Sequence, residues 1–217
     1  SIPSWEVVKT LVKQGFHYFR ISVLNSMYSV LPRLTVIYRG PNSASIGIVD
    51  VVEKLSMSVI NLCASLFRPL FSLSCHSPHK VAKKLFTVML LNGGVGLLFV
   101  GVMVVFNDTI TDYFFQKASV DLVFVGQILM VNAVASCFLL MSQPLSFYLQ
   151  GEGKTNRLSM VFLANIVLFV LLYLSMAEVF RLNILMSLAL CNVFISAFFW
   201  GILFYLSKKT SIIRLRG

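Results

Sequence analysis

Charged residues are scarce in this sequence: they make up 12% of its 217 residues, against about 25% in an ordinary soluble domain. Hydrophobic residues make up 58% of the chain, and its mean hydropathy is +0.86. These values exclude a soluble globular fold. The alternation of polar and apolar residues that is typical of membrane β-strands is also missing. The sequence therefore predicts an all-α polytopic membrane protein.

Residue patterns that carry catalysis or bind metals are equally rare. The four cysteines form no C-x-x-C pair and are expected to be small packing residues. His76 and His79 stand three residues apart with no cysteine or carboxylate nearby, which is typical of a solvated loop. No Ser/His/Asp set, paired carboxylates or phosphate-binding loop is present. We therefore predict neither an enzyme nor a protein that holds a metal or cofactor.

Acidic residues are few: the sequence has eight Asp and Glu but eighteen Lys and Arg, so its formal net charge is +10. In a soluble protein this excess of positive charge would indicate a nucleic-acid-binding function. Here it does not, because the chain is nearly all apolar and its nineteen Phe and two Trp suit lipid-facing helices. No nucleic-acid partner is expected, and the positive charges are better explained by membrane orientation.

Long apolar runs divide the chain into segments that can each cross a bilayer, which needs about 20 residues. About six crossings are predicted, at Phe16–Tyr38, Ile46–Phe71, Leu85–Phe106, Val120–Leu149, Leu158–Ala177 and Leu182–Leu206. The organisation expected from these runs is an interfacial amphipathic helix over 1–15, a six-helix membrane lobe over 16–207, and a basic cytoplasmic tail over 208–217.

The distribution of charge between these runs predicts the orientation. Most Lys and Arg residues fall on the side of the two chain ends, whereas Asp108, Asp112 and Glu178 fall on the other side. The positive-inside rule therefore places both ends in the cytoplasm, as an even number of crossings requires. The chain starts at Ser1 without a Met, and we expect it to be a piece of a longer protein.

Five charged residues lie within the first two predicted crossings: Arg33, Asp50, Glu53, Lys54 and Arg68. At about 2.5–3.5 kcal/mol for each lipid-facing charge, they would together cost about 15 kcal/mol. They cannot all face lipid. Helical spacing instead aligns polar residues in three crossings, as Ser22, Asn25, Ser29 and Arg33, as Asp50, Lys54, Asn61, Ser65 and Arg68, and as Asp121, Asn132, Ser136 and Gln143. Three polar stripes can enclose a hydrated cavity.

A simpler interpretation of the stripes is mutual neutralisation. Asp50 and Lys54 have the i,i+4 spacing of an ion pair, and Arg68 can extend to the headgroups. Arg33 has no acidic partner in its own helix, so it is the strongest single candidate for contact with an anionic ligand.

Proline and glycine mark the helices in two further ways. Bends in the helices are predicted at Pro32, Pro69 and Pro144. These bends could act as hinges, or they could be bends that a membrane helix tolerates without any functional role. The glycines of the segment 92–96 and Gly101 predict close contact between the third crossing and a neighbouring helix.

Two stretches resemble a known family. VLPRLTVIYRGPNSASIGIVDVVEKL, residues 30–55, resembles the seventh and eighth helices of bacterial polysaccharide flippases. MSQPLSFYLQGEGKTNRLSMVFLANIVLFVLLY, residues 141–173, is similar to their tenth and eleventh helices with a short Gly-Lys turn between them. These are the Wzx-type O-antigen flippases of the multidrug/oligosaccharidyl-lipid/polysaccharide exporter superfamily. The resemblance extends over the whole chain through hydropathy and turn pattern.

The resemblance implies that the chain is the C-terminal six-helix half of a transporter in the bacterial inner membrane. Its partners would be the N-terminal half, membrane lipids, a polysaccharide polymerase and an undecaprenyl-pyrophosphate-linked oligosaccharide. Arg33 and Lys54 would then meet phosphate or acidic sugars, and Asp50 and Glu53 would pair with them or carry a coupling proton. The complete candidate substrate site is Asn25, Arg33, Asp50, Glu53, Lys54, Asn61, Arg68 and Asn132.

Other functions fit parts of the same pattern. A drug or cation exporter would share the lobe but would favour a cavity rich in carboxylates. A polysaccharide polymerase or glycosyltransferase would act on similar lipid-linked sugars, but such enzymes need a larger loop than the roughly thirteen residues available on the non-cytoplasmic side. A purely structural membrane subunit would leave the charged stripes explained only by mutual neutralisation.

Overall fold

The computed structural model describes residues 5–39, 43–116, 120–176 and 183–215. Within these ranges the secondary structure is helical and no strand occurs. The helices are α1 (Trp5–Arg39), α2 (Ser43–Phe67), α3 (Pro69–His76), α4 (Pro78–Val105), α5 (Asn107–Phe115), α6 (Leu122–Gly151), α7 (Thr155–Leu174) and α8 (Ile184–Leu215). The predicted all-α fold is therefore confirmed for the described residues.

Local sequence signals explain several helix ends. Pro69 and Pro78 occupy the first positions of α3 and α4, where proline's missing N–H has no helical partner to lose. Asp121 caps α6 by accepting hydrogen bonds from the backbone N–H groups of Val123 and Phe124. Gly153 has φ +71° in the turn between α6 and α7, a backbone conformation that favours glycine.

Four helices contain segments that are long and apolar enough to span a membrane: Lys80–Val105 in α4, Leu122–Gly151 in α6, Thr155–Leu174 in α7 and Ile184–Lys209 in α8. These four segments indicate a multi-pass membrane protein. The first two predicted crossings also fall on long helices, α1 with 35 residues and α2 with 25. Their polar and charged residues make both less apolar than the other four. Within the described residues, composition therefore supports four of the six expected crossings.

Two of the predicted boundaries lie inside continuous helices. Helix α1 runs from Trp5 to Arg39 without a break near residue 15, so the expected interfacial segment and first crossing form one helix. Helix α8 likewise continues past residue 208 to Leu215. Of the three predicted proline bends, Pro69 separates α2 from α3, whereas Pro32 and Pro144 lie within α1 and α6.

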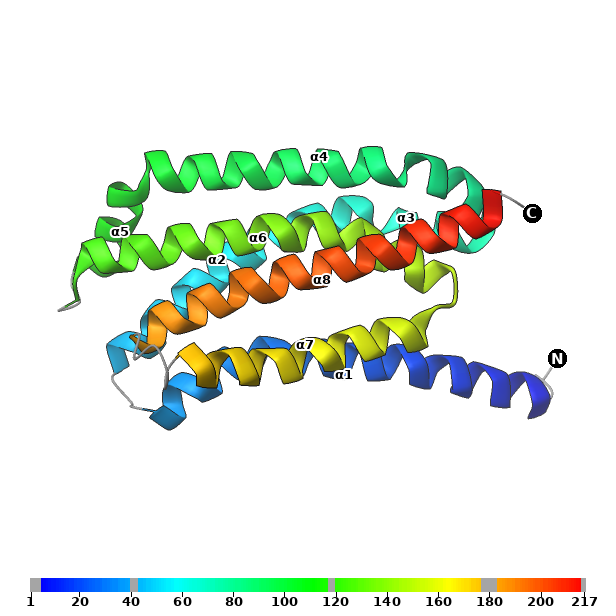
Figure 1. Ribbon diagram of the computed structural model, residues 1–217, viewed down its shortest axis with the longest axis horizontal. Helices are drawn as coiled ribbons and strands as arrows, with labels where there is room; N and C mark the ends of the chain where they lie inside the picture. The colour runs from blue at the N-terminus through cyan, green and yellow to red at the C-terminus, as the bar shows by residue number, and fades with distance from the viewer. Residues whose placement is uncertain (1–4, 40–42, 117–119, 177–182, 216–217) are drawn as a thin grey trace.

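The long helices form an elongated bundle in which α6 is central (Figure 1). Helix α6 packs against α4, α8 and α2, while α1 packs chiefly against α7. Both ends of the described chain lie at one end of the bundle, together with α3 and the turn between α6 and α7. Helix α5 lies at the opposite end. We call these the terminal end and the distal end.

Close packing of α4 on α6 depends on two glycines. A Cβ added at Gly96 would lie 2.7 Å from Cys137 Sγ and 2.9 Å from Cys137 Cα, and one at Gly93 would lie 3.3 Å from Met141 Cγ. Added Cβ atoms at Gly94 and Gly101 would meet nothing within 4 Å. The predicted close helix contact is confirmed for Gly93 and Gly96, as expected where van der Waals packing rather than hydrophobic burial joins membrane helices.

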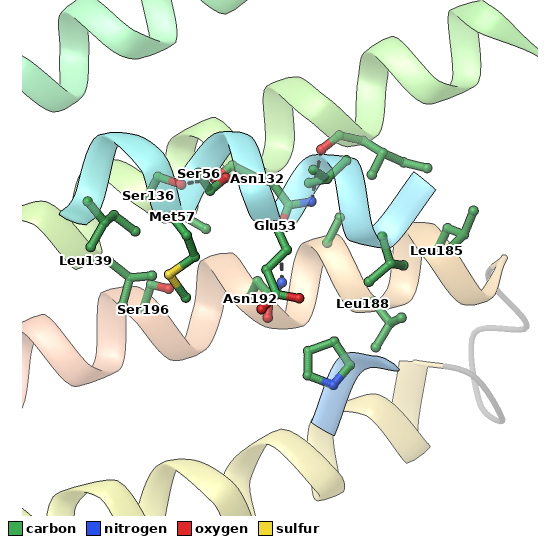
Figure 2. Close-up of a pocket in the computed structure, with 17 residues that line it drawn as sticks. Glu53, Ser56, Met57, Asn132, Ser136, Leu139, Leu185, Leu188, Asn192 and Ser196 are labelled. Atoms are coloured by element: carbon green, nitrogen blue, oxygen red, sulfur yellow. Dashed lines mark hydrogen bonds between the residues drawn. The ribbon is translucent and has the colours of Figure 1, made fainter. Parts of the chain in front are cut away.

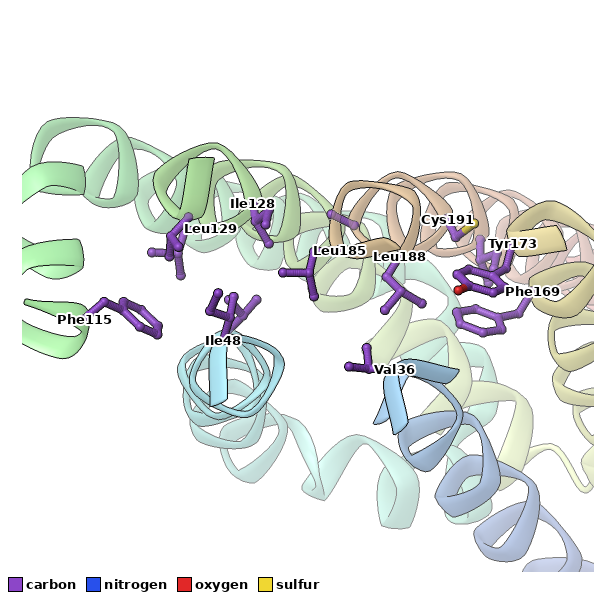
Figure 3. Packing of buried hydrophobic residues seen from close by; sticks show 14 residues of the cluster. Val36, Ile48, Phe115, Ile128, Leu129, Phe169, Tyr173, Leu185, Leu188 and Cys191 are labelled. Carbon is purple, nitrogen blue, oxygen red and sulfur yellow. The ribbon is translucent and has the colours of Figure 1, made fainter. Parts of the chain in front are cut away.

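Buried apolar residues form two main clusters. The distal cluster joins α1, α2, α6, α7 and α8 through side chains such as Val36, Ile48, Ile128, Phe169 and Leu188 (Figure 3). The second cluster, which includes Leu85, Tyr148, Leu158 and Leu203, joins α4, α6, α7 and α8. Polar cavities are found beside these clusters.

Candidate functional site

A small cavity lies between α2, α6 and α8, with Pro32 of α1 on its wall (Figure 2). Its volume is about 90 Å³, enough for several water molecules. Most of its wall is apolar. Its polar side chains come from three helices and are Glu53, Ser56, Asn132, Ser136, Asn192 and Ser196. We call it the Glu53 cavity.

A larger cavity lies between α1, α6, α7 and α8, with a volume of about 300 Å³. We call it the amide cavity, because three of its polar side chains from α6 and α7 are Gln143, Gln150 and Asn165. Its other polar side chains are Tyr18, Ser22, Asn25, Ser142 and Ser146. Leu139 lines both this cavity and the Glu53 cavity, so the two cavities adjoin at that side chain.

One face of α6 supplies polar groups to both cavities. Asn132 and Ser136 line the Glu53 cavity, and Gln143 and Gln150 line the amide cavity. The intervals of four and seven residues keep these side chains on one side of an α-helix. The predicted stripe of the fourth crossing is thus confirmed from Asn132 to Gln143. Asp121 does not belong to it, because its carboxylate caps the start of α6.

Hydrogen bonds hold the polar groups of the Glu53 cavity in place. Asn132 donates from Nδ2 to the Ile128 carbonyl at 3.0 Å and accepts at Oδ1 from Asn192 Nδ2 at 3.1 Å. Ser136 Oγ donates to the Asn132 carbonyl at 2.9 Å. The Asn132–Asn192 bond connects α6 to α8 across the bundle (Figure 2). Paired amides of this kind stabilise helix contacts where no bulk water competes.

Arg33 on α1 lies between two carboxylates of α2. Its Nε atom is 2.9 Å from Asp50 Oδ1 and 3.0 Å from Glu53 Oε2. The Nε–H group donates a hydrogen bond to Glu53, whereas Asp50 Oδ1 accepts none. We call the three residues the Arg33 cluster. With all three groups ionised, the cluster carries a formal charge of −1.

The Arg33 cluster changes the interpretation of its members. Arg33 has no acidic partner in its own helix, but the fold supplies two from the next helix. An anionic ligand would have to compete with both carboxylates for the guanidinium, so the geometry does not favour anion binding at Arg33. The alternative of an Asp50–Lys54 ion pair also does not match the structure, because the ion-pair partner found for Asp50 is Arg33.

The other predicted residues of α2 lie on its outer side. Lys54 and Asn61 of α2 are exposed, as is Arg68 just after its end, and the buried residues Val52 and Cys63 lie on the opposite side of the helix. The α2 stripe is therefore a hydrophilic outer face that points away from both cavities. Among the predicted site residues, the structure brings together Arg33, Asp50 and Glu53, places Asn132 next to Glu53 in one cavity, and places Asn25 in the other.

Several cavity residues escaped the sequence analysis. Asn192 and Ser196 are spaced by four residues on α8, and Asn165 is an isolated amide on α7. Only the i,i+4 spacing of the first pair gave a signal, since the surrounding residues are apolar. Asn165 is just 3% exposed, and its Oδ1 atom is buried without a hydrogen-bond partner.

The described residues contain no group of three or more His, Cys, Asp or Glu side chains that could hold a metal ion. Cys63 and Cys191 are buried free thiols, as expected of packing residues. Searches for related proteins give no match to any protein-family model, to any curated protein or to any solved structure.

Proposed function

We propose that this chain is one lobe of a transporter that moves lipid-linked oligosaccharides across the bacterial inner membrane by alternating access, as in Wzx-type flippases. The observation that carries the proposal is the pair of adjoining cavities, whose walls include amides, hydroxyls and the Glu53 carboxylate, inside a bundle with four candidate membrane spans. The bond between Asn132 and Asn192 is explained by helix packing alone, but packing does not explain the buried Asn165 Oδ1 atom, which has no hydrogen-bond partner.

The chemistry of a lipid-linked oligosaccharide explains why such a lobe is needed. Its sugar head is too polar for hydrocarbon, and its isoprenoid tail is too apolar for water. A polar cavity inside the bundle replaces water around the head, while the tail stays in the bilayer. Rocking of two lobes around the bound head would then expose it to each face of the membrane in turn.

The outer face of α2 supports the presence of a second lobe. Lys54 lies near the middle of α2, and Lys54 and Asn61 are both exposed. If α2 crosses the bilayer, these groups would be expensive to place against lipid. A second lobe, or a hydrated space shared with it, would cover them. Lys54 and Arg68 also bring positive charge to this face for a pyrophosphate, a role for which Arg33 is poorly placed.

The distribution of charge at the two ends of the bundle supports an orientation with both chain ends in the cytoplasm. The terminal end carries basic residues such as Lys80, Lys83 and Arg157. The distal end carries Asp108, Asp112 and Asp121. This asymmetry is the one described by the positive-inside rule.

A second candidate function is export of small organic cations. It is favoured by the net negative charge of the Arg33 cluster and by the position of Glu53 on a cavity wall. A cation could replace Arg33 as the partner of Glu53.

Deletion of the gene in its own bacterium tests both functions. Loss of a polysaccharide flippase should lower surface polysaccharide and cause lipid-linked repeat units to accumulate, as measured by gel electrophoresis and mass spectrometry. A plasmid copy should reverse both changes. Unchanged polysaccharide together with increased sensitivity to cationic drugs would reject the flippase proposal and favour the exporter.

A further inference from the structure

The amide cavity differs from the Glu53 cavity because none of the described residues on its wall carries a formal charge. Its polar groups are neutral amides and hydroxyls, and the rest of its wall includes the aromatic side chains Phe147, Phe162 and Phe199. Its volume of about 300 Å³ is at the lower end of the range for small-molecule sites. The cavity therefore suits an uncharged group, since a buried ion would lack a counter-charge there.

Asn165 gives the cavity an unused hydrogen-bonding position. The side chain lines the cavity and is 3% exposed, yet its Oδ1 atom has no hydrogen-bond partner. A buried carbonyl oxygen without a donor is unfavourable, because it loses the hydrogen bonds that water would give it. Other polar groups on the wall are already bonded to protein: Ser142 Oγ donates to the Leu139 carbonyl at 2.6 Å, and Gln150 Nε2 donates to Ser146 Oγ at 3.2 Å.

A sugar ring has the complementary chemistry. Its hydroxyl groups donate to amide oxygens and accept from amide nitrogens, and its C–H faces can pack on aromatic rings. Phe162 and Phe199 lie close together on the wall, with ring centroids 5.1 Å apart. A phosphate would find no cation among the described residues of this wall, so it would remain outside the cavity.

We propose that the amide cavity binds the uncharged sugar part of the ligand and that the side-chain amide of Asn165 forms a hydrogen bond with one of its hydroxyl groups. This inference rests on the proposed function and adds to it a location for the sugar, separate from the Arg33 cluster.

The test compares two probes on the whole 217-residue chain in lipid nanodiscs. The first probe is farnesyl diphosphate linked to a disaccharide of neutral hexoses, and the second is farnesyl diphosphate alone. Native mass spectrometry measures the affinity of each. The wild-type chain should bind the sugar-bearing probe at least fivefold more tightly, and Asn165→Leu should weaken its binding by about three- to tenfold, the usual effect of one neutral hydrogen bond. Binding of farnesyl diphosphate alone should not change.

Asn192→Leu is the matched control, because Asn192 lines the Glu53 cavity instead. It should leave the preference for the sugar-bearing probe unchanged. The melting temperature adds a second readout: Asn165→Leu should melt at the same or a higher temperature than wild type, since it removes a buried oxygen that has no partner. A lower melting temperature would show that Asn165 has a structural role and would overturn the inference.

The remaining outcomes separate this inference from the proposed function. If Asn165→Leu keeps the full preference for the sugar-bearing probe, the assignment of the amide cavity is wrong while the flippase proposal stands. If the wild-type chain shows no preference for that probe, the sugar site is absent. If neither probe binds, the inference fails, and the flippase proposal is then decided by the gene-deletion experiment.

Discussion

The Arg33 cluster gives the sharpest prediction about energetics. Arg33 Nε lies 3.0 Å from Glu53 Oε2 in a hydrogen bond, and 2.9 Å from Asp50 Oδ1 without one. The side chains of Arg33, Asp50 and Glu53 are 39%, 36% and 24% exposed. Two unit charges 3 Å apart attract by about 5 kcal/mol at an effective dielectric constant of about 20. Partial exposure reduces this strongly, and we expect about 1–2 kcal/mol for Arg33–Glu53 and about 0.5 kcal/mol for Arg33–Asp50.

Double-mutant cycles measure these two coupling energies separately. Arg33→Met is combined with Glu53→Gln in one cycle and with Asp50→Asn in another, and unfolding in detergent is followed by circular dichroism. Lys54→Met combined with Glu53→Gln is the control. Lys54 is exposed and has no ion pair within 4 Å among the described residues, so its coupling should be close to zero.

The order of the coupling energies decides the outcome. The Arg33–Glu53 coupling should be the larger, because only that pair combines opposite charge with an aligned donor. A coupling below about 0.3 kcal/mol, the scatter of such cycles, would refute the reasoning. So would a larger coupling for Arg33 with Asp50 than with Glu53.

Three further predictions follow from the fold. Gly96→Val should destabilise the chain by about 1–3 kcal/mol in thermal unfolding, because its side chain would overlap Cys137, whereas Gly94→Val should have a smaller effect because a Cβ there meets nothing within 4 Å. In a background without native cysteines, Lys54→Cys should react with a membrane-impermeant maleimide. Leu98→Cys, on the apolar surface of α4, is the control and should not react. Equal labelling of the two variants would contradict a hydrated α2 face. The 217-residue chain alone should not flip a fluorescent lipid-linked oligosaccharide in liposomes, and measurable flipping would show that no second lobe is needed.

The positions of the long helices could be predicted from the sequence far better than the contacts between helices. Each predicted crossing overlaps a long helix, because runs of about 20 apolar residues leave few alternatives in a bilayer. Two segments expected to be polar connections, 72–84 and 107–119, include helical residues of α3, α4 and α5. Short helices such as α3 and α5 have no long apolar run to reveal them, and the packing of α3 and α5 on α6 is a tertiary property.

The candidate site was only partly predictable, for a related reason. Periodicity correctly placed Asn132, Ser136 and Gln143 on one face of α6. It could not show that the face of α2 with Lys54 and Asn61 points outward. Helical spacing defines which residues share a face, but the direction of that face depends on neighbouring helices.

Arg33 illustrates the same limit at the level of a single residue. The predicted first crossing, Phe16–Tyr38, contains no acid, and the only acid of α1 is Glu6 in its first turn. The carboxylates that pair with Arg33 come from 17 and 20 residues further along the chain. Asn165 is the opposite case, since a single amide in the apolar middle of α7 gave no pattern at all. Its importance becomes visible only through burial and an unused acceptor.

Under the proposed function, Leu139 has a consequence for energy conservation. Its side chain belongs to the walls of both cavities, so an isobutyl group stands where the two cavities meet. Protons and small ions cross hydrocarbon poorly, and they travel readily only along connected water. Under the proposed function, this apolar side chain would interrupt the water between the two cavities and so would limit leakage of protons and small ions through the bundle.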